Sequence, residues 1–151
     1  MSQSLARVWL HVVFSTKQRR AYLQNDVFRD EMFKMIGFHV NETGCSAVRA
    51  GGWHDHIHFV CGLSRTMTIA SLIEHVKTET SKWAKHAGSG VSTFSWQSGY
   101  GAFSVSHSNL VTVTEYIKDQ AGHHKRRTFQ DEFRELCLRH EIEIDERYVW
   151  D

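Results

Sequence analysis

The sequence predicts an α+β fold: an antiparallel sheet with helices on one face, followed by C-terminal helices. Three observations lead to this prediction. Segments rich in β-branched and aromatic residues alternate with segments of helical periodicity. Their order is βαββαβ and then two helices, which is the order of ferredoxin-like domains. The length of 151 residues suits one hydrophobic core, so we expect a single domain over residues 1–151, with an acidic helix and tail over 127–151.

Four segments have the composition of strands. The first ends in a polar, basic turn, Thr16–Arg20. The pair Gly51 and Gly52 predicts a tight turn, so the second and third strands should form a hairpin. The predicted strands are residues 8–15, 45–50, 54–63 and 100–106.

Four further segments carry apolar residues at helical spacing. The first begins behind Asn25 or Asp26, either of which can cap a helix, and it stops at Gly44. Gly88 provides the stop of the second helix. The second, third and fourth predicted helices span about residues 68–86, 109–120 and 129–140.

Charge is divided unevenly along the chain. The formal net charge is only +1, but residues 1–127 hold 15 Lys and Arg against 9 Asp and Glu, and residues 128–151 hold 3 against 8. A polyanion could therefore bind the first part while the acidic tail lies elsewhere. Charges that are merely solvated would give the same pattern.

The sequence also indicates the cellular setting. The N-terminal residues lack the apolar stretch of a signal peptide, and no apolar run is long enough to span a bilayer. The cysteines Cys45, Cys61 and Cys137 are odd in number and irregularly spaced, which indicates reduced, partly buried thiols. We therefore expect a soluble cytoplasmic protein that does not associate with membranes.

Histidines alternate along the third predicted strand. Successive side chains of a strand point to opposite faces, so His54, His56 and His58 share one face, and His11 of the first strand can look onto the same surface. The opposite face is apolar and should lie under the helices, which would leave the imidazoles on the uncovered side of the sheet. The apolar set is Ile57, Phe59, Cys61 and Leu63.

Two imidazoles two residues apart on a strand can bind one divalent cation, because their side chains project in parallel. His56 and His58 are therefore candidate metal ligands. The alternatives are hydrogen-bonded surface histidines, a cupin-like site, and a zinc site that recruits Cys45 or Cys61. The lack of a CxxC pair, and the position of Cys61 on the opposite strand face, speak against zinc.

The third predicted helix carries Tyr116 and Gln120, which are four residues apart and therefore neighbours on one side of it. Beside a metal site they could supply a nucleophile and an oxygen ligand. A packing tyrosine and a solvated glutamine are the alternative. Two basic clusters could contact phosphates or simply be solvated: Lys17, Arg19 and Arg20, and, after the helix, Lys125, Arg126 and Arg127.

In combination, these segments resemble the single-tyrosine HUH transposases of the IS200 insertion-sequence type. The resemblance covers nearly the whole chain and depends on motifs in a fixed order. They are Asp55-His-Ile-His58, the segment 96–106 with its Gly-Tyr-Gly-Ala-Phe, Tyr116-Ile-Lys-Asp-Gln120, and the basic run before Thr128-Phe-Gln-Asp-Glu-Phe133.

The resemblance implies a ferredoxin-like or RNA-recognition-motif-like fold and a homodimer that recognises subterminal DNA hairpins. It implies that His56, His58 and Gln120 bind Mg²⁺ or Mn²⁺ and that Tyr116 is the nucleophile. The enzyme would cleave and rejoin single-stranded DNA at insertion-sequence ends through a 5′-phosphotyrosine intermediate. The tyrosine helix of one subunit would complete the histidine site of the other. His54 falls outside the two-histidine pattern, and its role stays open.

Two other functions fit the same residues. A related HUH nuclease, either a rolling-circle replication initiator or a domesticated transposase acting on repeated extragenic palindromes, would keep the chemistry. A non-catalytic nucleic-acid-binding module would instead use the open sheet face and its aromatic residues, as RNA-recognition domains do. The HUH nuclease would depend on a metal ion and form a covalent product with DNA, whereas the binding module would do neither.

Overall fold

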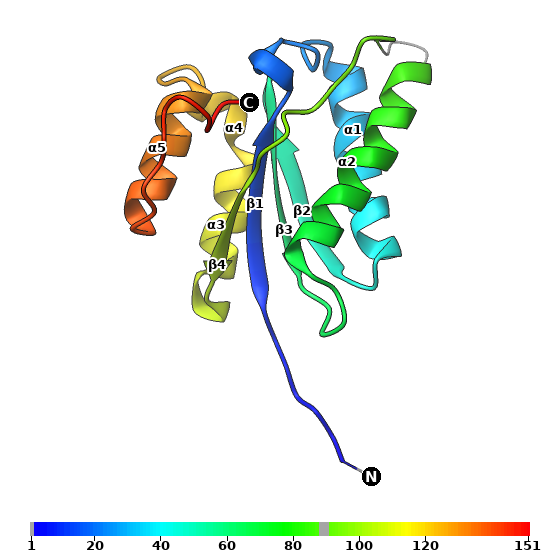
Figure 1. Ribbon diagram of the computed structural model, residues 1–151, viewed down its shortest axis with the longest axis vertical. Helices are drawn as coiled ribbons and strands as arrows, with labels where there is room; N and C mark the ends of the chain where they lie inside the picture. The colour runs from blue at the N-terminus through cyan, green and yellow to red at the C-terminus, as the bar shows by residue number, and fades with distance from the viewer. Residues whose placement is uncertain (1, 88–90) are drawn as a thin grey trace.

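The computed structural model describes residues 2–87 and 91–151. A four-stranded sheet forms its centre, in the spatial order β2-β3-β1-β4 with antiparallel neighbours. Figure 1 shows helices α1 and α2 on one side of the sheet and α3, α4 and α5 on the other. The predicted α+β fold is confirmed. The elements are β1 Trp9–Ser15, α1 Asp26–Glu42, β2 Ser46–Gly52, β3 His56–Gly62, α2 Ile69–His86, β4 Gly101–Val105, α3 Leu110–Lys118, α4 Gln120–His123 and α5 Phe129–Arg139, with short 3₁₀ helices at Lys17–Arg19 and His107–Asn109.

Local sequence signals set the ends of the two longest helices. The Asn25 side chain accepts a hydrogen bond from the Phe28 amide at 2.9 Å, so Asn25 is the cap of α1. Thr68 caps α2 in the same way. Gly44 follows α1 with φ +83°, a backbone conformation that glycine adopts without strain. The predicted stop of α2 at Gly88 lies outside the described residues.

The larger hydrophobic core lies between the sheet and helices α1 and α2. Alternate residues of β1 and β3 point into it, as the period of two predicts. All three cysteines are buried and free, in agreement with the sequence. The core includes Leu10, Val12, Phe14, Phe28, Met32, Ile36, Ile57, Phe59, Cys61, Leu72, Ile73 and Val76.

The opposite face of the sheet is covered as well. Helix α5 carries Phe129, Phe133 and Cys137 at a spacing of four residues, and this apolar stripe packs on Val13 and Phe103. The expectation of an uncovered histidine face is therefore wrong. The acidic C-terminal segment also does not lie apart from the basic part of the chain, because burial of the α5 stripe holds it against the sheet.

The turn of the β2–β3 hairpin lies later in the chain than predicted. Gly51 and Gly52 belong to β2 and pair with β3, and the turn consists of residues 53–55. His54 therefore lies in the turn and not on the strand. The two glycines do not form the turn; they let other backbone segments approach the sheet closely.

Gly51 marks the point where α3 lies closest to β2. A Cβ atom at this position would lie 2.5 Å from the carbonyl oxygen of Ile117 and 2.9 Å from its Cγ2 atom. We expect Gly51→Ala to lower the free energy of unfolding by about 1–3 kcal/mol, because α3 must move off the sheet. Denaturant unfolding measures the change.

Gly37→Ala is the matched control for this prediction. Gly37 lies within α1, and a Cβ atom there would meet no other atom within 4 Å. Alanine in a helix interior should be neutral or stabilising by about 0.5–1 kcal/mol. A Gly51→Ala protein as stable as the wild type would contradict the close packing of α3.

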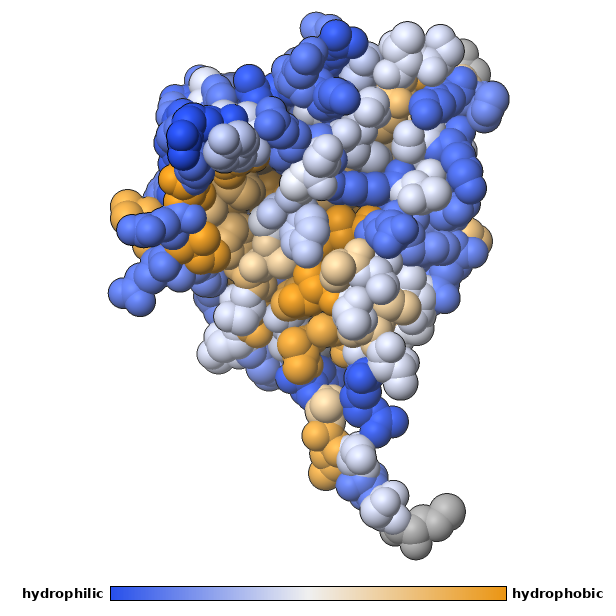
Figure 2. All heavy atoms as spheres, viewed as in Figure 1, coloured by the Kyte–Doolittle hydropathy of each residue, from blue (hydrophilic) through white to orange (hydrophobic). Residues whose placement is uncertain are grey.

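The periphery is mainly polar, but hydrophobic side chains are exposed at several places on it. Residues 2–8 leave the body as an extended arm in Figure 1. Figure 2 shows hydrophobic residues at the surface near the middle of the molecule, where a pocket of about 540 Å³ adjoins β4 and α5. Among the helices of residues 2–87 and 91–151, none combines the length and the hydropathy needed to cross a membrane.

Candidate active site

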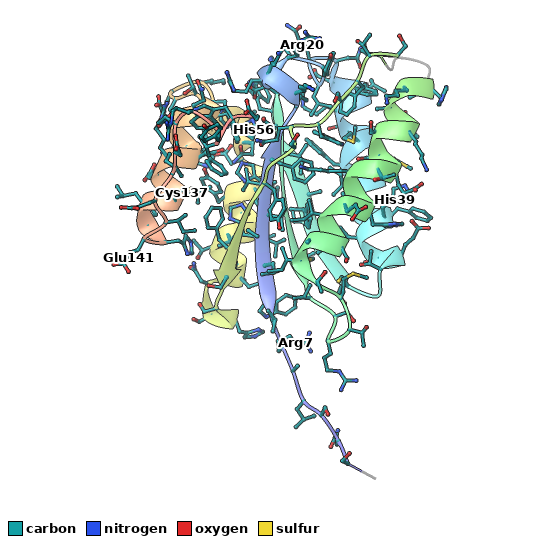
Figure 3. All side chains as sticks on the ribbon, viewed as in Figure 1. Arg7, Arg20, His39, His56, Cys137 and Glu141 are labelled. Carbon is teal, nitrogen blue, oxygen red and sulfur yellow. The ribbon has the colours of Figure 1, made fainter. Side chains whose placement is uncertain are left out.

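Four residues predicted from the sequence meet on the face of the sheet covered by α3, α4 and α5. His56 and His58 lie side by side on β3, with ring centroids 5.2 Å apart. Helix α3 returns over the sheet after β4 and brings the Tyr116 ring within 5.9 Å of the His58 ring. Gln120 Oε1 lies 3.0 Å from His56 Nε2. Figure 3 shows His56 between the sheet and the C-terminal helices.

The helix that carries Tyr116 breaks before Gln120. Asp119, with φ −98° and ψ 33°, separates α3 from α4, where a single helix over residues 109–120 was predicted. The Gln120 side chain is nevertheless buried, and its amide nitrogen is 3.5 Å from the Tyr116 carbonyl oxygen. The predicted proximity of Tyr116 and Gln120 is therefore present across the break.

Glu132 of α5 lies at the centre of this cluster and was not singled out from the sequence. Its Oε1 atom is 2.8 Å from His58 Nε2 and 3.4 Å from His56 Nε2. Its Oε2 atom accepts hydrogen bonds from Gln120 Nε2, at 3.3 Å, and from the Tyr116 hydroxyl. One fully buried carboxylate thus contacts all four predicted residues.

The sequence does contain a signal for Glu132. Phe129, Phe133 and Cys137 define the apolar side of α5, and Glu132, three residues after Phe129, falls on that side. An acid on a buried helix face requires partners, because an unpaired buried charge is costly. His124 also joins the cluster, with Nε2 3.0 Å from Gln120 Oε1, although the sequence placed it only in a basic run.

Hydrogen bonds at the second ring nitrogen orient both strand histidines. His56 Nδ1 lies 2.8 Å from Asp55 Oδ1, and His58 Nδ1 lies 2.8 Å from His11 Nε2. Partners of this kind hold the imidazole in place and direct its other nitrogen toward a ligand. His11 therefore faces the same site, as predicted, although it is buried.

Burial and neighbouring charges act on the three histidines differently. Burial lowers the pKa of His58, and it lowers the pKa of His11 to about 3, so His11 is neutral at pH 7. Burial would also lower the pKa of His56, but hydrogen bonds with Asp55 and Glu132 outweigh it and raise the pKa to about 9. His56 is thus the strand histidine that holds a proton at neutral pH, and a cation that binds its Nε2 atom would displace this proton.

The carboxylate and the phenol have pKa values displaced in opposite directions. Burial would raise the pKa of Glu132, but its interaction with His58 and hydrogen bonds from His124, His56 and His58 hold it well below its usual range. Burial, and then the negative charge of Glu132, raise the pKa of Tyr116. The phenol is therefore protonated and the carboxylate ionised at neutral pH.

The donor atoms of the cluster suit a divalent cation. His56, His58 and Glu132 offer ligand atoms that all lie within 4.8 Å of one another, and the Gln120 oxygen is a fourth donor beside them. Imidazole nitrogens combined with oxygen ligands fit Mn²⁺, while Mg²⁺ prefers oxygen. Cys61 lies in the core on the other side of the sheet, so it cannot join these ligands.

A groove beside the cluster is lined by arginines from both predicted basic clusters. Its volume is about 590 Å³, and Arg19, Arg126 and Arg127 line it. Trp53 and His54 also line it, with their rings stacked at a centroid distance of 4.3 Å. The other predicted phosphate contacts do not line this groove and are exposed: Lys17, Arg20 and Lys125.

Comparison with known families supplies the identification. The family model described as "Transposase IS200 like" matches residues 4–120. The chain belongs to this family. No curated protein matches it significantly. The part of this IS200-like transposase that the family model matches ends at Gln120, so α5 and its Glu132 lie beyond it.

Two solved structures resemble this IS200-like transposase in fold. A transposase candidate from Deinococcus radiodurans R1 aligns with a TM-score of 0.58 and 18% identity, over 80% of this chain and 98% of that chain. A REP-associated tyrosine transposase bound to a REP hairpin aligns with a TM-score of 0.57 and 14% identity, over 82% of this chain and 74% of that chain. At such identities the likeness concerns the fold.

In the single chain that forms this structure, Tyr116 of the IS200-like transposase lies over the histidines of the same chain. Completion of the site by the tyrosine helix of another subunit stays a prediction. The physical reason for the same-chain position of Tyr116 is local. Only a short 3₁₀ helix, His107–Asn109, separates β4 from α3, and Gly51 lets Ile117 pack directly on β2.

Proposed function

We propose that this protein is a metal-dependent DNA transposase that cleaves and rejoins single-stranded DNA through a 5′-phosphotyrosine intermediate. Tyr116 is the nucleophile, and His56, His58, Gln120 and Glu132 hold the cation. The supporting observation is that the Tyr116 hydroxyl and the donor atoms of these four residues converge on one point next to a basic groove. Arg127 lines this groove and lies 3.4 Å from the Tyr116 hydroxyl, so a phosphodiester that reaches Arg127 would meet a nucleophile and a cation site together.

Glu132 positions the Tyr116 hydroxyl for attack. The hydroxyl donates a hydrogen bond to this carboxylate, which holds the phenol oxygen beside the cation site. Because the pKa of Glu132 is low, the phenolic proton passes to solvent as the phenol oxygen attacks phosphorus. The bond from phosphorus to the 3′ oxygen breaks, and this oxygen takes up one proton from solvent, which balances the one that the phenol released, to become a free 3′-hydroxyl. Because one phosphate ester replaces another, a later 3′-hydroxyl can reverse the step without ATP.

The bound cation and Arg127 would balance charge around the reacting phosphate. Mn²⁺ or Mg²⁺ at this site would polarise a non-bridging phosphate oxygen and offset the Glu132 charge that raises the pKa of Tyr116. Arg127 Nη2 lies 3.4 Å from the Tyr116 hydroxyl, where it can contact the same phosphate. We expect Mn²⁺ to bind more tightly than Mg²⁺, because imidazole is a nitrogen ligand.

The groove beside the cluster supports single-stranded DNA as the substrate. Arg19, Arg126 and Arg127 can contact phosphates, and the stacked Trp53 and His54 rings offer an aromatic surface for an unpaired base. We propose that the substrate carries a subterminal hairpin, as the REP hairpin bound by the structural relative suggests. A homodimer remains part of the proposal, although the cluster itself needs no second chain.

The non-catalytic alternative has less support from the fold. RNA-recognition domains bind nucleic acid on an open sheet face, whereas α3, α4 and α5 cover that face here. A domesticated nuclease acting on repeated extragenic palindromes would share the whole cluster, so the choice of DNA distinguishes it. An insertion-sequence enzyme should prefer hairpins that flank its own gene.

The protein should form a covalent adduct with its DNA. We expect incubation with Mn²⁺ and single-stranded DNA from the flanks of its own gene to yield a protein–DNA product that survives denaturing electrophoresis. A label on the 3′ side of the cleaved bond should stay with the protein, because the phosphotyrosine retains the 5′ phosphate. Duplex DNA and a chelator provide the controls.

Each outcome of the adduct experiment has a definite meaning. Adducts with gene-flanking hairpins support the insertion-sequence enzyme, and adducts only with palindromes repeated elsewhere in the genome support the domesticated nuclease. Tight hairpin binding that is insensitive to chelators and leaves no adduct under any of these conditions would contradict a strand-transfer function.

A further inference from the structure

We propose a second metal site, for Zn²⁺, formed by His39 and Glu42 of α1 and His75 of α2. The ligand atoms of these three side chains all lie within 4.8 Å of one another. The site is separate from the candidate active site, because α1 and α2 lie on the opposite side of the sheet. Figure 3 shows His39 on α1, well away from His56.

One carboxylate oxygen joins the three side chains. Glu42 Oε1 lies 3.1 Å from His75 Nε2 and also makes a hydrogen bond with His39 Nδ1. The two imidazole rings are 5.7 Å apart and nearly perpendicular, at 74°. Both ring nitrogens therefore approach the same carboxylate oxygen, which keeps the three ligand atoms within reach of one ion.

Helix geometry explains why these residues meet. His39 and Glu42 are three residues apart on α1, so they lie on one side of it, and α2 packs alongside α1 and presents His75 to that side. The His39 side chain is 9% exposed, which fixes its ring, while Glu42 and His75 are 42% and 37% exposed. An ion can enter from solvent and retain water as a fourth ligand.

The ligand chemistry favours zinc. Zn²⁺ takes four ligands in tetrahedral geometry, and two imidazoles with one carboxylate and a water form a ligand set that it uses. Mg²⁺ and Ca²⁺ prefer oxygen ligands throughout. Glutamate is ionised at neutral pH, so Glu42 brings a negative charge to the site.

A bound zinc ion would connect the C-terminal part of α1 to the middle of α2. Such a link stabilises the folded chain, because the unfolded chain does not bring the three ligands together. The role we assign to this site is therefore structural. It strengthens the helical layer behind the sheet on which the candidate active site is built.

Zinc binding to the intact chain tests this site. We expect His75→Ala to bind one zinc fewer per chain than the wild type in equilibrium dialysis, or to bind it more weakly on the order of tenfold or beyond. ZnCl₂ should raise the unfolding temperature of the wild type more than that of His75→Ala. His86→Ala, which removes an exposed histidine from the same helix, should behave as the wild type does.

Two additions keep this test specific. Repeating the comparison in a His58→Gln background removes zinc bound at the candidate active site, and the difference caused by His75→Ala should persist. Glu42→Gln keeps a hydrogen-bonding side chain but loses the anionic ligand, so it should also weaken zinc binding. Equal zinc content and equal zinc-dependent stabilisation in the wild type, His75→Ala and Glu42→Gln would overturn the proposal.

Discussion

Tyr116→Phe is expected to abolish the covalent protein–DNA adduct while it leaves hairpin binding within about twofold of the wild type. The change removes one hydroxyl oxygen and no positive charge, so contacts with phosphates remain. Loss of a nucleophile typically costs on the order of 10⁴-fold or more in rate. The phenol also loses its hydrogen bond to Glu132, which should cost about 1 kcal/mol of stability. Denaturing gels measure the adduct, and a binding titration measures affinity.

Tyr100→Phe is the matched control. Tyr100 precedes β4 and is 42% exposed on the apolar pocket, away from the histidine cluster. It should form the adduct as the wild type does. If Tyr116→Phe kept the adduct and Tyr100→Phe lost it, Tyr100 would replace Tyr116 as the nucleophile.

Mixing two inactive variants tests the single-chain site. One chain carries Tyr116→Phe, and the other carries His56→Ala with His58→Ala. If each tyrosine acts on the histidines of its own chain, as the packing of α3 on its own sheet indicates, verified heterodimers stay inactive. Adduct formation by the mixture would show instead that α3 exchanges between subunits, and the roles of Tyr116, His56 and His58 would stand.

His58→Gln should reduce Mn²⁺ affinity on the order of 100-fold and remove metal-dependent cleavage. His58 Nε2 is one of the candidate metal-ligand atoms and lies next to Glu132. A glutamine side chain has no imidazole nitrogen to bind the ion at that position. We prefer glutamine to alanine because it can still donate a hydrogen bond to the buried carboxylate, which would otherwise lose a partner. Electron paramagnetic resonance counts bound Mn²⁺ without reference to activity.

His54→Ala is the control for metal binding. His54 lies in the turn before β3, beside the groove, and its ring stacks on Trp53 rather than joining the donor atoms. It should keep wild-type Mn²⁺ affinity and affect DNA binding at most. Wild-type Mn²⁺ affinity in a correctly folded His58→Gln protein would refute the assignment of this ligand.

Features set by neighbouring residues were predictable from the sequence. Alternation along a strand placed His56 and His58 on one face, and Asn25 and Gly44 marked the two ends of α1 because caps act within a few residues. The proximity of Tyr116 to Gln120 also followed from helical spacing, and it survives the break at residue 119.

The cover over the histidines was not predictable in the same way. The apolar stripe of α5 predicts that the helix packs against another apolar surface. It does not predict which surface, because hydrophobic contacts are not directional. In the structure, α5 packs on the sheet face that bears Val13 and Phe103. The packing of α5 on this face brings Glu132 into the cluster. It also covers the face that an RNA-recognition module would use.

The sequence by itself determined the order of the elements, the strand face of His56 and His58, and the helix side of Tyr116, because each depends on a short repeat of backbone geometry. Only the tertiary structure decided that α3 lies on its own sheet and that α5 covers the site. It also decided that Glu132 contacts His58, which lies 74 positions earlier in the chain. Those outcomes depend on which surfaces fit one another at close range, as Gly51 does under Ile117, and no local pattern encodes that fit.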